Sequence, residues 1–109
     1  MSYSIKTIPQ FDKQLKRLIK KYPSFKADFL PFVQSLRQIP TQGTAIGKNC
    51  YKVRIAISAK SKGKSGGARV ITNLVVTDST VYLLAIYDKS EKEMLTDKEL
   101  TELLKYVPV

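Results

Sequence analysis

Three strand-like runs in the second half of the chain place the strongest constraint on its fold. Residues 51–57 alternate between apolar positions and a second set that includes Lys52 and Arg54, which is the two-residue period of a half-buried strand. The β-branched and apolar runs 69–76 and 81–87 are separated only by four turn-forming residues, the pattern of a hairpin. Three consecutive strands with short links favour an antiparallel meander.

Helical patterns fill most of the first half. Residues 9–22 place their apolar side chains on one helical stripe, and lysines and an arginine cover much of the rest. Residues 25–39 repeat the three- and four-residue apolar spacing. Pro31 interrupts this second pattern and is expected to kink or break the helix, because proline has no backbone N–H to donate.

The remaining segments complete an α+β domain. Thr96 and Glu99 have the spacing of a capping box and predict the start of a C-terminal helix. Residues 3–7 alternate like a strand, whereas residues 40–49 show no strong period and are predicted to be a loop. The predicted order is β-α-α-β-β-β-α, an antiparallel sheet of about four strands with helices packed on one face.

The size and composition indicate one ordinary globular domain spanning residues 1–109. The chain has 109 residues, of which 43% are hydrophobic, and its single cysteine, Cys50, excludes an intramolecular disulfide. No apolar run has the length of a signal peptide or a membrane span. We therefore expect a cytoplasmic protein without a membrane partner.

The charge balance predicts a polyanionic partner. Nineteen Lys and Arg stand against nine Asp and Glu, which gives a net charge of +10, and the sequence pI is near 9.8. Such an excess is typical of nucleic-acid binding, although solubility or an acidic protein partner would also account for it. The chain has no histidine, so Ser–His and Cys–His nucleophile pairs and zinc sites of the usual Cys and His type are excluded. We expect neither a metal nor a small-molecule cofactor.

Basic residues of the predicted strands form a candidate RNA site. Lys52 and Arg54 lie two apart in a strand and therefore project from the same face. Arg69 begins the next strand and Lys89 follows the last, so neighbouring strands would bring four cations together on the face without helices. The further RNA-binding candidates are Lys60, Lys62 and Lys64 of the glycine-rich connection, with Tyr87 and Tyr51 as stacking residues.

A site of this kind can bind RNA or cleave it. Cleavage by the 2′-hydroxyl needs removal of a proton, stabilisation of charge at the phosphorane and a proton for the leaving oxygen. Clustered cations supply the second requirement directly. A lysine crowded by other cations generally has a lowered pKa and becomes a usable base. Composition and spacing alone favour RNA binding over RNA cleavage.

Three motifs resemble a known family. The runs Lys52-Val-Arg-Ile-Ala, Gly63-Lys-Ser-Gly-Gly-Ala-Arg-Val-Ile71 and Leu84-Ala-Ile-Tyr-Asp-Lys-Ser-Glu91 occur in the order found in RelE/HigB-like toxins of bacterial type II toxin–antitoxin systems. The predicted element order matches that family over nearly the whole chain. The resemblance implies a microbial-ribonuclease-like fold, an endonuclease that cuts mRNA in the ribosomal A site, and a cognate antitoxin protein as partner.

The resemblance also implies which residues function and where this chain departs from the pattern. The functional positions of the family correspond to Lys52, Arg54, Arg69 and Lys89. Some relatives have arginine where Lys89 stands, and a lysine cannot clamp a phosphate bidentately. Some also use a tyrosine where this chain has Met94 and Leu95, so that role is vacant or passes to Tyr87.

Three alternatives remain open. A ParE-like toxin that inhibits DNA gyrase shares the fold but generally lacks the full set of basic residues. A non-catalytic RNA-binding module would bind RNA with a steep salt dependence and leave it uncut. An inactive relic would retain only the binding of its antitoxin.

Overall fold

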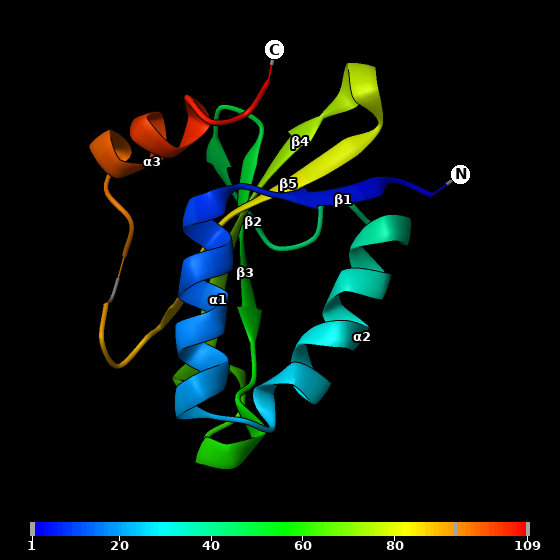
Figure 1. Cartoon of the computed structure of the whole chain (residues 1–109). Helices are drawn as coiled ribbons and strands as arrows, with labels where there is room; N and C mark the ends of the chain where they lie inside the picture. The colour runs from blue at the N-terminus through cyan, green and yellow to red at the C-terminus, as the bar shows by residue number, and fades with distance from the viewer. Residues whose placement is uncertain (1, 93, 109) are drawn as a thin grey trace.

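The structure, a computed structural model, describes residues 2–92 and 94–108 and consists of a five-stranded sheet and three helices (Figure 1). The strands, in the spatial order β1-β5-β4-β3-β2, are β1 (Ser4–Thr7), β5 (Thr80–Asp88), β4 (Ala68–Val75), β3 (Cys50–Ile55) and β2 (Thr44–Gly47). The helices are α1 (Pro9–Lys21), α2 (Phe25–Gln38) and α3 (Asp97–Leu104). None of the described helices is long and apolar enough to cross a membrane.

The α+β class and the predicted meander of the last three long strands are confirmed, but the sheet has five strands and is mixed. β3, β4 and β5 pair antiparallel, whereas β1 pairs parallel with β5. The additional strand, β2, lies in a segment that was predicted to be a loop. Its side chains are mostly exposed at the sheet edge, so it carries no apolar alternation that a sequence pattern would reveal.

A two-residue turn joins β2 to β3. Lys48 and Asn49 both have positive φ angles, 56° and 59°, as the tight turns of two-residue hairpins require. Gly47 and Cys50 face one another on either side of this turn. The hairpin therefore depends on left-handed backbone at two residues that are not glycine, and the missing Asn-Gly or Asp-Gly signature explains why the sequence did not predict it.

Pro31 was predicted to break or kink the second helix. It does not break the helix, because α2 runs continuously from Phe25 to Gln38. Proline costs this helix one backbone hydrogen bond. Packing offsets that cost: the buried aromatic rings of Phe25, Phe29 and Phe32 lie on the other side of the helix from the exposed Pro31. The ring centroids of Phe29 and Phe32 are 5.9 Å apart, within the usual range for aromatic pairs.

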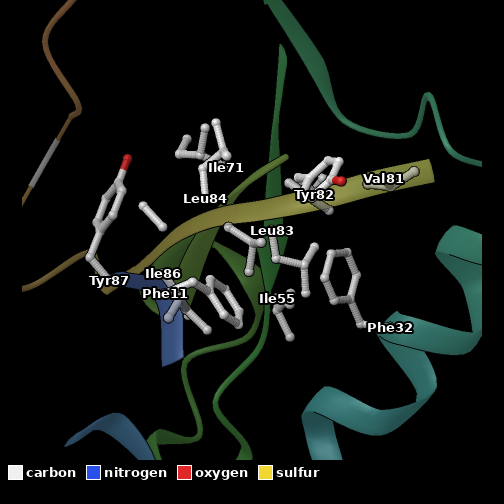
Figure 2. Packing of buried hydrophobic residues seen from close by; sticks show 14 of the residues in the cluster. Phe11, Phe32, Ile55, Ile71, Val81, Tyr82, Leu83, Leu84, Ile86 and Tyr87 are labelled. Atoms are coloured by element: carbon white, nitrogen blue, oxygen red, sulfur yellow. The ribbon is translucent and has the colours of Figure 1, made fainter. Parts of the chain in front are cut away.

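Apolar side chains cover both faces of the central strands. Figure 2 shows Phe11 of α1 and Phe32 of α2 on one side of β5, and Ile71 and Leu84 on the other. Helix α3 covers part of the second side. This follows from one cavity that is lined both by Ile71 of the sheet and by Leu100 of α3. The expectation that all helices pack on one face, leaving the other open to solvent, is therefore wrong for α3. This arrangement buries nearly all of β4 and all of β5.

Candidate functional site

Three neighbouring strands present a continuous row of polar side chains on the face opposite α1 and α2. Arg54 of β3 is the register partner of Arg69 of β4, and Arg69 is in turn the partner of Tyr87 of β5. Register partners project from the same face of a sheet. Lys52 belongs to the next row, opposite Ile71. We call the surface formed by these five residues the site face.

The two basic residues of β3 differ in their exposure. Arg54 is exposed, whereas Lys52 is half-buried beside the segment that leads into α3. Neither side chain has a hydrogen-bond or ion-pair partner among residues 2–92 and 94–108. The structure thus brings together the first pair of predicted site residues on one face, and no described residue neutralises either cation.

Arg69 has a different environment, because it is only 3% exposed. Its guanidinium donates hydrogen bonds to the backbone carbonyls of Lys64 (2.9 Å), Ser65 (3.1 Å) and Ala68 (3.2 Å). Burial, followed by the charge of Arg54, lowers the pKa of Arg69. The guanidinium thus fastens the glycine-rich loop, residues 58–67, to the site face. A guanidinium has five N–H groups, so part of its bonding capacity remains.

The remaining predicted cations lie around this loop. Lys62 and Lys64 are exposed, and the carbonyl contact with Arg69 brings the backbone of Lys64 next to the site face. Lys89 is exposed just beyond β5, and its backbone N–H donates to the carbonyl of Gly67 at 3.1 Å. None of these three lysines has a carboxylate partner within the described part of the chain. They extend the unpaired positive charge of the site face toward the loop.

Lys60, by contrast, uses its charge inside the fold. Its Nζ lies 2.8 Å from Oδ1 of Asp88, and only 12% of the side chain is exposed. The carboxylate of Asp88 also accepts hydrogen bonds from Tyr22 Oη at 3.1 Å and from the backbone N–H and Oγ of Ser90. Burial alone would raise the pKa of Asp88, but these donors, Lys60 first, outweigh it and hold the pKa well below its usual value.

Asp88 is a residue that the sequence reasoning missed. It ties the loop of Lys60 to α1 and to the end of β5, and so fixes one end of the loop while Arg69 fixes the other. The available signal was an acidic residue directly after the predicted apolar run 81–87. An ionised side chain that is only 2% exposed must be paired, and its partner is the Lys60 that was predicted to bind RNA.

The two tyrosines proposed for stacking are both placed differently from the expectation of exposed rings. Tyr51 projects to the same side as Val53, the side of α1 and α2, and packs against the core. Tyr87 is on the site face but is only 9% exposed. Its hydroxyl has no hydrogen-bond partner within the described ranges, and Figure 2 shows it pointing away from the core. Burial raises the pKa of this hydroxyl, and the charge of Arg69 opposes the shift.

The acidic residues of the described ranges do not gather into a metal site. No group of three or more His, Cys, Asp or Glu side chains lies close enough together there to hold a metal ion. The polar groups of the site face are cations and a phenol, which bind anions and move protons. The arrangement suits phosphate chemistry that proceeds by electrostatic stabilisation and proton transfer.

Comparison with known proteins places the fold among RelE-like structures. No family model and no curated protein sequence matches this chain. Solved structures do match: a mutant of the E. coli toxin RelE in the free state superposes with a TM-score of 0.63 at 15% identity, covering 99% of this chain and 100% of that one. The chain therefore has the RelE fold over nearly its whole length.

Two further matches contain an antitoxin. The RelE mutant in complex with the antitoxin peptide RelBc covers 99% of this chain with a TM-score of 0.54 at 15% identity, and 100% of that chain is matched. The intact E. coli RelBE toxin–antitoxin complex covers 80% of this chain and 96% of the matched one, with a TM-score of 0.51 at 16% identity. The sequence resemblance to RelE/HigB-like toxins and the three-dimensional similarity thus point to the same fold.

Proposed function

We propose that this chain is the toxin of a type II toxin–antitoxin module and cleaves mRNA in the ribosomal A site. The observation that carries the proposal is a group of cations on and beside the site face of a RelE fold that have no carboxylate partner among the described residues. The members of this group are Lys52, Arg54, Lys62, Lys64 and Lys89. A net charge of +10 adds a field that attracts RNA to this surface.

The proposed reaction is attack by the 2′-oxygen of one nucleotide on its own 3′-phosphate. The 2′-hydroxyl gives up a proton, the new P–O2′ bond forms, the P–O5′ bond breaks, and the departing 5′-oxygen takes up a proton. The products are a 2′,3′-cyclic phosphate and a 5′-hydroxyl. Lys52 and Arg54 bind the phosphate and share the proton chemistry, and Lys89 assists the leaving oxygen or binds the backbone. The developing phosphorane charge is stabilised electrostatically.

The part we assign to Arg69 follows from its contacts. The resemblance placed Arg69 among the functional residues, where a guanidinium free to reach the RNA would stabilise the phosphorane directly. Three hydrogen bonds to carbonyls and an exposure of 3% favour a positioning role instead. Arg69 holds the loop that carries Lys62 and Lys64, and its buried positive charge contributes to the electrostatic potential at the site face. Its remaining N–H groups can still contribute when RNA is seated against Arg54.

The proposed partners are an antitoxin, mRNA and the ribosome. The solved RelE complexes with RelBc and with RelB support a protein antitoxin that binds this fold. An acidic or amphipathic segment would complement the charge of the site face, where Arg54 and the loop lysines are exposed. Binding of such a segment would compete with RNA for the same cations.

Purified components test the proposal directly. The chain is mixed with a defined mRNA, with and without ribosomes, and new 5′ ends are mapped by primer extension. We expect cuts only when ribosomes are present, and a loss of at least a hundredfold in rate for Lys52→Ala combined with Arg54→Ala. The matched control is Lys13→Ala combined with Lys16→Ala on the exposed face of α1, which should cut normally. Binding of RNA without cuts would favour the non-catalytic RNA-binding module. Inhibition of DNA gyrase in a separate supercoiling assay would favour the ParE-like alternative.

A further inference from the structure

A carboxylate from α2 holds the start of the glycine-rich loop. One oxygen of Asp28 accepts a hydrogen bond from the backbone N–H of Ser58 at 3.0 Å, and the other accepts from the Oγ of the same residue. The two residues are 30 positions apart in the chain. Figure 1 shows the start of the cyan helix α2 close to the green loop at the bottom of the view. The contact joins the helix layer on one side of the sheet to the loop that borders the site face.

The ordinary role of such a carboxylate does not account for this contact. An acidic residue in the first turn of a helix commonly stabilises that helix, because it faces the positive end of the helix dipole. Asp28 lies in the first turn of α2, and Asp12 has the same place in α1. Within the described ranges only Asp28 of this pair bonds to another element through its side chain. No cation lies within ion-pair distance of Asp28 there, although the chain has nineteen Lys and Arg residues.

The residue that Asp28 binds begins a single 3₁₀ turn, η1 (Ser58–Lys60). Ile57 stands at the N-cap position of this turn and has no side-chain acceptor, so the first N–H needs a partner from elsewhere. Asp28 provides it. At the other end of the turn Lys60 is paired with Asp88. The turn is therefore held by one carboxylate at each end, and the two carboxylates together set its orientation.

The orientation of η1 affects the exposed lysines that follow it. Ser61 ends the turn in the left-handed conformation, with a φ of 54°, and leads directly into Lys62. The aliphatic stem of Lys62 lies against Gly66, where an added Cβ would come within 2.7 Å of the Cβ of Lys62. The loop is thus packed on itself. A displacement of Ser58 is therefore passed on to Lys62 and Lys64, which are both exposed.

We propose that Asp28 is a positioning residue of the candidate RNA site: it presents Lys62 and Lys64 to the phosphates of the strand without touching RNA itself. This inference rests on the proposed function, because the strand is the one that the cations of the site face bind. The effect of positioning is opposite in sign to that of charge. Removal of a carboxylate raises the net positive charge, which by itself strengthens binding of RNA. Loss of positioning weakens it.

Binding of a short, fluorescein-labelled single-stranded RNA, followed by anisotropy without ribosomes, separates the two effects. We expect Asp28→Ala to bind at least about threefold more weakly than the wild type, in spite of its added positive charge. The matched control Asp12→Ala loses the same charge from the first turn of α1 and should bind as tightly as the wild type or more tightly. In the ribosome assay Asp28→Ala should raise KM and leave kcat nearly unchanged.

A second background shows whether the effect passes through the loop lysines. When Lys62→Ala and Lys64→Ala are already present, Asp28→Ala should cause no further loss of RNA affinity, because the side chains that it positions are gone. Amide hydrogen exchange should accelerate at Ser58 and in residues 59–62, while β4 and β5 stay protected. Ser58→Ala removes the Oγ bond from the loop side, leaves α2 intact, and should weaken RNA binding in the same lysine-dependent way.

An RNA affinity of Asp28→Ala equal to that of Asp12→Ala would overturn the positioning role and leave the proposed endonuclease standing. A loss of affinity that persists without Lys62 and Lys64 would overturn it too, because it would show a general effect on the fold. Lysine-dependent weakening in a chain that makes no cuts on the ribosome would instead contradict the endonuclease and support the role of Asp28 in RNA binding.

Discussion

Arg69 and Tyr87 are register partners on β4 and β5, and both are buried on the face that carries the candidate site. The guanidinium of Arg69 is turned to the carbonyls of the glycine-rich loop, and the hydroxyl of Tyr87 points away from the core (Figure 2). One side chain thus shapes the loop that carries exposed lysines, while the other lines a cavity beside Lys52. The exposed Arg54 completes the row.

Substitution of Arg69 separates a positioning role from a role of charge alone. Arg69→Lys keeps the charge, but one ammonium cannot reproduce the forked contacts with three carbonyls. We expect cleavage to fall at least tenfold and amide hydrogen exchange in residues 62–67 to accelerate. Arg69→Ala should do the same and lower the free energy of unfolding by about 2 kcal/mol. An Arg69→Lys protein with normal cleavage and unchanged exchange in the loop would contradict the positioning role.

The buried ion pair of Asp88 and Lys60 should dominate the acid sensitivity of the loop. The pKa of Asp88 is lower in the folded protein than its ordinary value of 3.8. Its ionised form therefore stabilises the fold fully above about pH 4, and this contribution declines as the pH falls below 3.8 toward the folded pKa. The substitution Asp88→Asn should lower the free energy of unfolding by about 3 kcal/mol at neutral pH, because it leaves the buried charge of Lys60 without its partner.

Urea unfolding between pH 2 and pH 7 measures this dependence. The slope of stability against pH below pH 4 should be smaller in Asp88→Asn than in the wild type. Asp78→Asn, in the exposed tip of the β4–β5 hairpin, is the control and should leave both the slope and the stability nearly unchanged. An identical slope in Asp88→Asn would show that the carboxylate has no preferential ionisation in the fold.

The N-terminus of α3 should begin to respond to acid at a higher pH than Asp88. Glu99 completes the capping box with Thr96 and accepts a 2.6 Å hydrogen bond from Lys92, and these contacts, Lys92 first, lower its pKa to about 2. The capping interaction is present above the ordinary pKa of 4.5 and declines as the pH falls from there toward 2. The substitution Thr96→Ala should lower the free energy of unfolding by about 1 kcal/mol at neutral pH, because it removes the N-cap hydroxyl of α3. Amide exchange in α3 measures both effects, and exchange that is unaffected by the substitution would contradict the capping role.

Gly67 is the glycine of the loop with the strictest steric requirement. A Cβ at this position would collide with the backbone of Ile55 and Ala56 at the end of β3. We expect Gly67→Ala to destabilise the protein by about 1–3 kcal/mol and to reduce RNA cleavage, because the strand end and the loop must separate. The substitution Ser65→Ala, at an exposed position of the same loop, should change the free energy of unfolding by less than about 0.5 kcal/mol. Thermal unfolding compares the two variants, and a fully stable Gly67→Ala protein would contradict this account of the loop.

The sequence predicted the elements whose patterns are local. The alternation in β3, the hairpin of β4 and β5, and the capping box of α3 all depend on near neighbours, and all are present. Strand β2 was missed because an exposed edge strand needs no apolar face. The parallel pairing of β1 with β5 was missed because it joins opposite ends of the chain. The continuous α2 shows that burial of its phenylalanines outweighs the local effect of Pro31.

The candidate site was predictable in part for the same reason. Spacing placed Lys52 and Arg54 on one face, and the strand order then added Arg69. What no spacing reveals is which cation is already paired. Lys60 and Lys62 look equivalent in the sequence, yet only Lys60 meets a buried carboxylate, because Asp88 is brought to it from a distant strand. Long-range partners decide whether a cation belongs to the core or to the site.

The most direct test of the central claim is to map mRNA 5′ ends in bacterial cells within minutes of inducing this chain without an antitoxin. We predict discrete new ends confined to translated reading frames, and none when Lys52→Ala and Arg54→Ala are combined in a protein that folds normally. Intact messages in cells that stop growing would contradict the endonuclease and favour gyrase inhibition or simple RNA binding. Intact messages in cells that grow normally would identify the chain as an inactive relic.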